Sequence, residues 1–113
     1  MRSKILALSK NEDFKSLLTK KKISNKYTTI FFGNLANKNI QKLNISFVVK
    51  KKIGNAVKRN KIKRRLRNII NEATRKMTLN LKYSYLVIAK PTMLNNDYTN
   101  IKEILFQELK KIK

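Results

Sequence analysis

Three segments of the chain have the apolar pattern of β-strands. Residues 27–32 (YTTIFF) are β-branched or aromatic throughout, and residues 83–90 (YSYLVIAK) are strongly apolar and end at Pro91. Between Leu43 and Val49 every second residue is a large apolar one, which is the period of a strand with one buried face. These residue types favour strands, and we expect the first two strands to pair antiparallel through a long loop.

The longest helical pattern lies between residues 56 and 77. Its apolar residues fall on one stripe at about 100° per residue; they are Ile62, Leu66, Ile69, Ile70, Ala73 and Met77. Asn55 precedes this pattern, and asparagine is favoured at the position that caps a helix N-terminus. The sequence therefore predicts one long amphipathic helix that packs a single face against the sheet.

Two shorter helices complete the order of elements. The first begins with a capping-box pattern, Ser9 and Glu12, and ends near Lys20, while the last begins near Asn100. The expected order is α-β-β-α-β-α, in which the long helix joins two parallel strands as a βαβ unit. We therefore expect a single α+β domain over residues 1–113, with a small central sheet and helices on at least one face.

The charge of the chain is large and unevenly distributed. Its 113 residues include 28 Lys and Arg against 6 Asp and Glu and no His, for a net charge of +22. Such a field collects polyanions, so a nucleic acid or an anionic membrane surface is the expected partner. Residues 50–76 contain twelve basic residues and one acid, Glu72, and thus +11 of that charge. Because solvated helix faces usually mix both signs, this density favours phosphate contacts that weaken steeply with salt.

The polar face of the long helix combines arginine with asparagine. Asn60, Arg64, Arg67 and Asn71 fall at offsets of 0, 4, 7 and 11 and share one side of a helix. An asparagine amide both donates and accepts hydrogen bonds, which suits a base edge or a ribose hydroxyl; a neutral choice in an Asn-rich sequence is the alternative. Arg59 lies in the first turn near the apolar stripe, so we expect it to project past the edge of the sheet toward the polyanionic partner, with little effect on stability.

Three lysines, Lys50–Lys52, follow the second strand. One interpretation is that they clamp phosphates at the edge of the sheet. The other is that they protect an exposed edge from aggregation, as lysines often do.

Absent residues exclude several classes of function. Without Cys or His the chain has no disulfide, no thiolate nucleophile, no Cys/His zinc site and no imidazole base. Its few carboxylates are scattered among lysines, which disfavours a self-sufficient enzyme. No segment approaches the roughly 18–20 apolar residues of a membrane span, and the apolar run at residues 5–8 is too short for a secretory signal. We therefore expect a cytoplasmic protein.

Two nucleic-acid-binding classes remain open on these grounds. A ribosomal or other structural RNA-binding protein fits the composition. A DNA-binding or nucleoid protein fits the charge, although no helix-turn-helix or dimerising heptad pattern is present.

One segment resembles a family signature. The stretch IGNAVKRNKIKRRLR closely resembles the signature K-x-G-N-A-V-x-R-N-x-x-K-R of the bacterial ribonuclease P protein component. The matching residues are Lys52, Gly54, Asn55, Ala56, Val57, Arg59, Asn60, Lys63 and Arg64. The stretch from Leu8 to Phe14 resembles the first helix of that family, and Ala89-Lys90-Pro91 resembles the end of its third strand. The resemblance thus covers nearly the whole chain.

The resemblance implies a function in which the protein is not the catalyst. In that family a large RNA, with Mg²⁺, cleaves precursor tRNA at the 5′ end of the mature tRNA, and the small protein binds that RNA and the 5′ leader. The implied partners are the catalytic RNA and precursor tRNA, with no membrane and no required protein partner. Mg²⁺ belongs to the holoenzyme with its RNA, and none is expected on the protein alone. The implied fold is that of the second domain of ribosomal protein S5, with a left-handed βαβ crossover.

The resemblance also assigns candidate residues. Those expected to contact the catalytic RNA are Lys52, Asn55, Lys58, Arg59, Asn60, Lys61, Lys63, Arg64, Arg65 and Arg67. Those expected to bind the leader are Phe14, Phe31, Lys50 and Lys51. Lys61 replaces the usual arginine of the family and loses the bidentate fork. Leu18, one turn after Phe14, stands where a second aromatic residue is often found.

Overall fold

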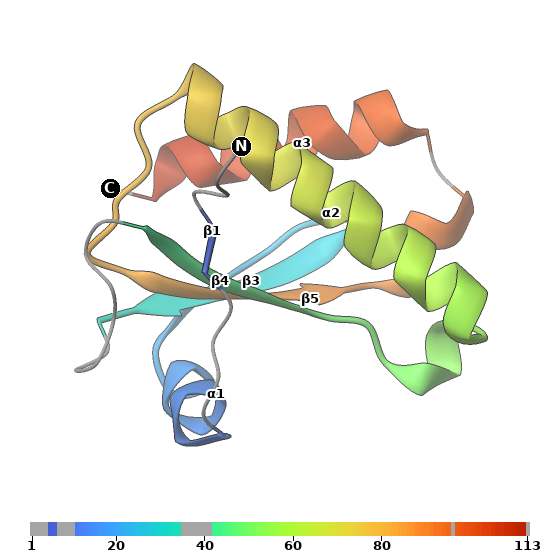
Figure 1. Cartoon of the computed structure of the whole chain (residues 1–113), viewed down its shortest axis with the longest axis horizontal. Helices are drawn as coiled ribbons and strands as arrows, with labels where there is room; N and C mark the ends of the chain where they lie inside the picture. Colours follow the sequence, from blue (N-terminus) through green and yellow to red (C-terminus); the bar gives the residue numbers. More distant parts are fainter. Residues whose placement is uncertain (1–4, 7–10, 35–41, 96, 113) are drawn as a thin grey trace.

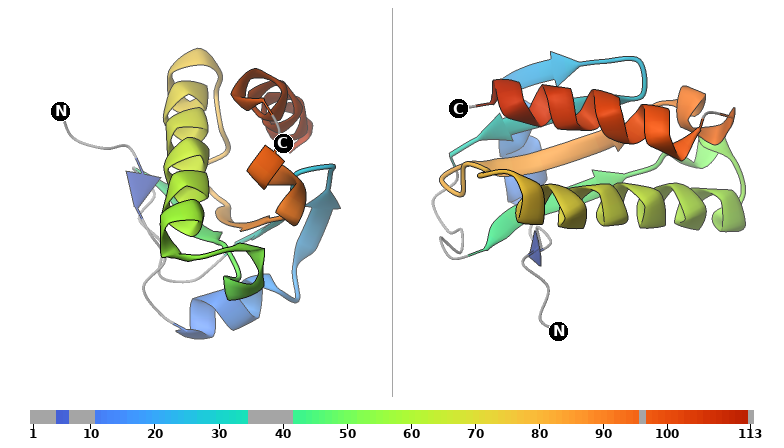
Figure 2. Two further views of the ribbon diagram at one scale, coloured as in Figure 1. Left: turned by 90° about the vertical axis from the view of Figure 1, so that its right-hand side faces the viewer. Right: turned by 90° about the horizontal axis from the view of Figure 1, so that it is seen from above.

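One mixed sheet separates the helices into two layers (Figure 1). The computed structural model describes residues 5–6, 11–34, 42–95 and 97–112, which contain a five-stranded sheet in the order β1-β4-β5-β3-β2. The strands are β1 (Ile5–Leu6), β2 (Lys21–Ser24), β3 (Thr28–Gly33), β4 (Leu43–Val48) and β5 (Ser84–Ala89). The helices are α1 (Asn11–Leu17), α2 (Ala56–Lys76) and α3 (Tyr98–Lys111), and the 3₁₀ turns are η1 (Lys51–Ile53) and η2 (Pro91–Asn95). Helices α2 and α3 lie over one face of the sheet and α1 over the other (Figure 2).

The expected α+β class is confirmed, but the expected strand pairing is wrong. β3 and β4 do not form a hairpin, because β5 lies between them, antiparallel to β3 and parallel to β4. The physical reason is that β5 is buried along most of both faces, and the most apolar strand takes the centre of a sheet covered on both sides. The parallel β4–α2–β5 unit is confirmed, while the hand of its crossover stays a prediction. Most of the connection from β3 to β4, residues 35–41, lies outside the described residues.

The edge strand β2 was not expected from the sequence. Residues 20–22 were predicted to end the first helix, but α1 ends at Leu17 and β2 pairs antiparallel with β3. An exposed, lysine-bearing edge strand lacks the apolar alternation by which strands are recognised. The Asn25 side-chain oxygen accepts hydrogen bonds from the backbone N–H groups of Tyr27 and Thr28, both at 2.8 Å, which fixes the tight turn into β3.

The start of α2 agrees with the prediction from the sequence, and the start of α3 does not. Asn55 caps α2, since its side-chain oxygen accepts the N–H of Lys58 at 3.0 Å, as predicted. Helix α3 begins at Tyr98, after Asp97, rather than near Asn100; the correction follows from the half-buried Tyr98, whose packing against the core adds an earlier turn. The predicted capping box at the first helix depends on Ser9, which lies outside the described residues.

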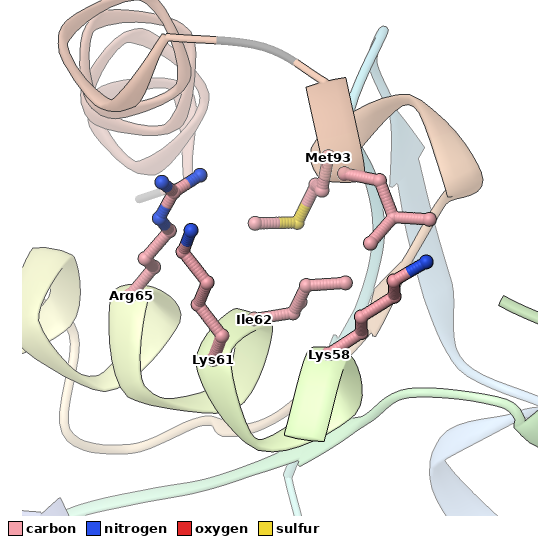
Figure 3. Close-up of a pocket in the computed structure, with 6 residues that line it drawn as sticks. Lys58, Lys61, Ile62, Arg65 and Met93 are labelled. Atoms are coloured by element: carbon pink, nitrogen blue, oxygen red, sulfur yellow. The ribbon is translucent and has the colours of Figure 1, made fainter. Parts of the chain in front are cut away.

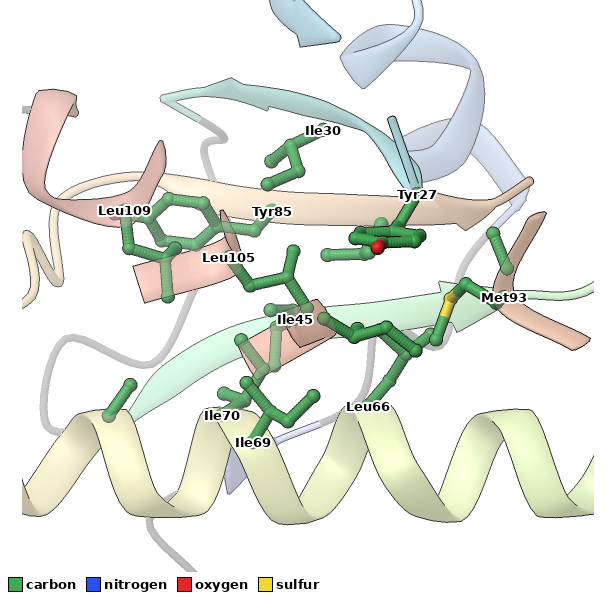
Figure 4. Close-up of a cluster of buried hydrophobic side chains, with 14 of the residues drawn as sticks. Tyr27, Ile30, Ile45, Leu66, Ile69, Ile70, Tyr85, Met93, Leu105 and Leu109 are labelled. Atoms are coloured by element: carbon green, nitrogen blue, oxygen red, sulfur yellow. The ribbon is translucent and has the colours of Figure 1, made fainter. Parts of the chain in front are cut away.

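The main core fills the space between the sheet and the two covering helices (Figure 4). The stripe of α2 is buried as predicted, through Ile62, Leu66, Ile69, Ile70 and Ala73. It meets alternate residues of β3, β4 and β5, including Ile30, Ile45 and Tyr85. On the opposite face, Leu17 and Leu86 are buried outside that cluster. The long helix is thus fixed by one face, and its other face is free for a partner.

Candidate nucleic-acid interface

Helix α2 presents a cationic outer face because its apolar stripe faces the sheet. The side chains of Asn60, Lys61, Arg64 and Arg67 are exposed, and those of Lys63 and Arg65 are half-buried at the flanks. Among the described residues, ion pairs within 4.0 Å involve a single carboxylate, that of Glu72. Arg64 and Arg67 therefore point to solvent without a carboxylate from the described part of the chain.

Glu72 serves the fold and leaves the charge of this outer face uncompensated. Its two oxygens lie 3.6 Å from Lys76 Nζ and 3.2 Å from Lys102 Nζ, so it connects α2 to α3. The hydrogen bond from Lys102, opposed in part by desolvation, holds the pKa of the Glu72 carboxyl below its ordinary value. The Glu72 carboxylate therefore stays ionised and paired with Lys76 and Lys102. It does not neutralise the cations nearer the N-terminus of α2.

The signature residues at the start of α2 also have structural roles. The Arg59 Nε donates a hydrogen bond to the Gly54 carbonyl oxygen at 3.2 Å. A Cβ on Gly54 would lie 3.0 Å from Cδ and 3.1 Å from Cβ of Lys58, so glycine makes room for that side chain. With the Asn55 cap, these contacts fix the entry into α2. These signature residues therefore hold the start of α2 in place, whereas other residues of the signature form its exposed cationic face.

The contact of Arg59 changes one expectation. We predict that Arg59→Ala lowers the free energy of unfolding by about 0.5–1.5 kcal/mol, because the half-buried guanidinium hydrogen bond is lost, and weakens RNA binding as well. Urea unfolding measures the first effect. Lys61→Ala, at an exposed position of the same helix, should leave stability unchanged; an unaltered midpoint for Arg59→Ala would mean that the bond to Gly54 stabilises nothing.

A basic pocket of about 170 Å³ lies between the first turns of α2 and η2 (Figure 3). Lys58, Lys61 and Arg65 rise from α2 around it, and Ile62 and Met93 supply its apolar lining. Met93 comes from a turn some thirty residues further along the chain, so helical spacing alone gives no sign of this pocket. Three cations gathered here extend the positive surface of α2 toward η2.

The candidate leader residues lie on the other face of the sheet. Ile30 and Phe32 point into the main core, so the half-buried Phe31 between them faces the α1 side. Phe14 is half-buried on α1 itself, and neither ring belongs to the main core cluster. Leu17 and Leu86 are buried on the same face, so packing under α1 is the alternative to leader binding for these two rings.

Two apolar residues of this α1 face, Val48 and Ile88, are not among the candidate residues assigned from the sequence. Phe31 is opposite Leu86 in the β3–β5 ladder, and Val48 is opposite Ile88 in the β4–β5 ladder. Val48 and Ile88 are half-buried and lie outside the main core. The alternation of side chains along β4 and β5 places both residues on this face, but it brings them together only because β5 lies beside β4.

The lysines after β4 lie where two surfaces meet. Lys50, Lys51 and Lys52 are exposed, the last two in η1. Lys50 keeps an extended backbone, with φ −69° and ψ 148°, and η1 packs against α2. These lysines therefore lie between the cationic face of α2 and the end of the α1 face. Because β1 pairs only with Leu43 and Asn44, the end of β4 beside the lysines has no described strand on its outer side, and the phosphate clamp and the edge guard stay alternative interpretations.

The described residues do not form a metal site or a membrane span. No group of three or more His, Cys, Asp or Glu side chains in the described part of the chain is placed to hold a metal ion. Within the same residues, no helix is long and apolar enough to cross a membrane.

Comparison with known proteins gives one consistent result. The profile of the family Ribonuclease P matches residues 3–113. The chain is 32% identical over 104 residues to the ribonuclease P protein component of Listeria innocua, covering 91% of this chain and 84% of that one. The chain is 37% identical over 106 residues to the Bacillus pumilus protein of the same name, covering 92% of this chain and 78% of that one.

Solved structures agree with the sequence comparison. The RNase P protein from Thermotoga maritima superposes with a TM-score of 0.79 at 25% identity, covering 96% of this chain and 98% of that one. The Staphylococcus aureus RNase P protein gives 0.70 at 28% identity, covering 93% and 92%. The similarity therefore extends over the whole fold and not only over the segment at the start of α2.

Proposed function

The chain belongs to the ribonuclease P protein family, the protein part of a ribonucleoprotein endoribonuclease, and on that premise we propose that it binds the catalytic RNA and the 5′ leader of precursor tRNA. The observation that carries the proposal is the outer face of α2, where the exposed Arg64 and Arg67 have no carboxylate partner within the described residues. Phosphates of a structured RNA supply the missing counter-charge. The reaction is then the removal of the leader by the RNA, which leaves the mature 5′ end.

The catalytic RNA binds the α2 side of the molecule in this proposal. Arg64 and Arg67 contact phosphates, and the exposed Asn60 between the cations supplies a donor and an acceptor for a base edge or a ribose hydroxyl. The lysines of η1 and the pocket beside η2 extend the contact along the start of the helix. Lys61 provides charge there without the planar fork of an arginine.

The leader binds the α1 face in this proposal. An unpaired strand stacks its bases on aromatic rings and places its phosphates near cations. Phe31 on β3 and Phe14 on α1 offer the rings, and Lys50 and Lys51 offer the charges at the end of that face. Because β4 leads through η1 into α2, the two RNA surfaces share the lysines between them.

The role of the protein is to position RNA and to neutralise its charge. Among the described residues no group of three or more His, Cys, Asp or Glu side chains could hold a metal ion, and we assign the chemical step to the RNA. Mg²⁺, when bound in the holoenzyme, supplies the activation of water or of the scissile phosphate, and the RNA holds it. The cytoplasm as the place of this reaction stays a prediction.

Competitive binding tests the choice of partner. The purified protein should bind the catalytic RNA of its own cell in preference to ribosomal RNA and to duplex DNA, when all three are compared at the same salt concentration. Salt must be fixed because phosphate contacts make affinity depend on it steeply. Equal binding to ribosomal RNA would favour the structural RNA-binding class, and a preference for duplex DNA would favour the nucleoid class.

The leader surface makes a separate prediction. Phe14→Ala should weaken binding of precursor tRNA to the reconstituted holoenzyme by about five-fold or more, because one stacking platform is worth about 1–3 kcal/mol, and should leave binding of mature tRNA unchanged. Fluorescence titration of both substrates measures the difference. Leu81→Ala, which shortens an exposed side chain outside α1, is the control. Equal losses for the two tRNAs would assign Phe14 to the core.

A further inference from the structure

A second basic pocket lies at the other end of the sheet from the start of α2. Its volume is about 570 Å³. Its lining residues come from the α1–β2 connection, the end of β3 and the start of β5; they include Thr19, Lys20, Lys21, Phe32, Gly33 and Tyr83. Gly33 pairs with Ser84 at the start of β5, whereas Val48, which precedes η1, pairs with Ile88 near its end. The pocket is therefore separate from the start of α2 and lies at the opposite end of the sheet, where Phe32 and Tyr83 pack at the margin of the main core.

The two lysines of this pocket are held by specific contacts. A Cβ on Gly33 would lie only 2.7 Å from Cγ and 2.8 Å from Cβ of Lys20, so the lysine stem lies directly across the glycine. The Lys20 backbone N–H donates to the Leu17 carbonyl at 3.0 Å, which fixes the turn after α1. Lys21 is opposite Phe32 in the β2–β3 ladder. Both charges are thus brought to the end of β3 by the fold.

The pocket also holds an aromatic ring in a fixed position. The Tyr83 ring is half-buried; its centroid lies 5.4 Å from that of Phe32 and 6.4 Å, edge-on, from that of Tyr85. Tyr85 is itself buried, and its hydroxyl donates to the Asn80 carbonyl at 2.7 Å. Rings supported in this way lose little freedom on binding. Tyr83 is therefore a rigid platform beside two cations.

We propose that this pocket binds an unpaired nucleotide of RNA, with its base stacked on Tyr83 and its phosphate contacted by Lys20 and Lys21. The pairing of an aromatic platform with basic side chains is the arrangement that binds single-stranded nucleic acid. None of the residues that line the pocket is acidic, so the charge complementarity is with an anion. The inference rests on the proposed function for its choice of RNA as the polymer.

Two RNAs offer such a nucleotide, and the test separates them. One is an unpaired segment of the catalytic RNA. The other is the leader, continued past the α1 face toward its 5′ end: the catalytic RNA is proposed to bind near η1, so nucleotides far from the cleavage site run toward the opposite end of the sheet. The first predicts an effect without any substrate, and the second predicts an effect that depends on leader length.

The experiment compares variants of the full-length protein. Lys20→Ala removes one phosphate contact, Tyr83→Leu removes the platform, and Tyr83→Phe keeps the ring. Lys82→Ala is the charge-matched control, since Lys82 is exposed beside Tyr83 but does not line the pocket. Affinity for the free catalytic RNA is measured first, and then the affinity of each reconstituted holoenzyme for precursor tRNAs whose leaders are lengthened one nucleotide at a time.

We expect Lys20→Ala and Tyr83→Leu to weaken one of the two interactions by about five-fold to tenfold, while Tyr83→Phe and Lys82→Ala stay near wild type. A loss with free catalytic RNA assigns the nucleotide to that RNA; a loss confined to long leaders assigns it to the leader. If wild-type protein binds both RNAs but Lys20→Ala and Tyr83→Leu behave as Lys82→Ala does, the pocket proposal is wrong and the proposed function stands. If wild-type protein shows no preference for either RNA, the proposed function fails and this proposal with it.

Discussion

Replacing Arg64 and Arg67 together by alanine should weaken binding of the catalytic RNA by about a hundredfold at moderate salt. Both side chains are exposed on the outer face of α2, and each phosphate contact contributes about one unit to the slope of log affinity against log salt. The double variant should therefore also flatten that slope by about two units. Filter binding over a range of salt concentrations measures both quantities.

The control for this prediction removes the same charge elsewhere. Lys110→Ala with Lys111→Ala takes two exposed cations from the last turn of α3 and lowers the net charge of the protein equally. We expect a small loss of affinity and an unchanged salt slope for it, since long-range attraction is screened within about 10 Å at 0.1 M salt. Equal effects of the two double variants would mean that net charge, and not the face of α2, determines binding.

Leu66→Ala should have the largest effect on stability. Leu66 is fully buried at the centre of the α2 stripe, with 0% of its surface exposed, and it contributes to the cluster that includes Ile45 and Leu105. Truncation of such a residue leaves a cavity and costs about 2–5 kcal/mol. For a domain of this size, the melting temperature should fall by about 10–20 °C. Thermal unfolding followed by circular dichroism measures the change.

Val57→Ala is the matched apolar truncation in the same helix. Val57 is 76% exposed, so its removal leaves no cavity, and alanine is the better helix former. Its melting temperature should equal or slightly exceed that of the wild-type protein. A fall as large as that of Leu66→Ala would contradict the division of α2 into a buried face and a free face.

Local patterns predicted the helix that carries the candidate site. The buried stripe from Ile62 to Ala73 repeats with the helical period over several turns, and Asn55 caps the helix where the sequence placed the cap. The period is a reliable guide here because a helix that packs on one side buries one continuous apolar stripe. The exposed positions of Lys61, Arg64 and Arg67 follow from the same period, whereas their contacts with RNA stay a prediction.

Contacts between distant segments were not predictable in this way. The position of β5 between β3 and β4 depends on which strand best fills a centre covered on both sides, and no local pattern records that competition. The two-residue β1 and the lysine-rich β2 are too short or too polar to show a period. The pocket formed with Met93 and the ring held at Tyr83 depend on such long-range placement.

Arg59 shows the limit of a signature as a guide to function. Its position in a basic motif predicted an RNA contact and no role in stability. Its Nε bonds the Gly54 carbonyl, so the same side chain helps to shape the entry into α2. A residue of a motif can bind a partner, stabilise the fold, or do both. The contacts in the structure are needed to tell these roles apart.

Reconstitution of precursor tRNA cleavage tests the central claim most directly. The protein alone, the catalytic RNA alone and the two together are incubated with precursor tRNA at low Mg²⁺, and release of the 5′ leader is followed with time. We predict no cleavage by the protein alone, slow cleavage by the RNA, and much faster cleavage by the two together, because the cations of the protein replace part of the charge neutralisation that Mg²⁺ otherwise provides. Cleavage by the protein in the absence of the RNA, or no acceleration of the RNA by the protein, would contradict the account.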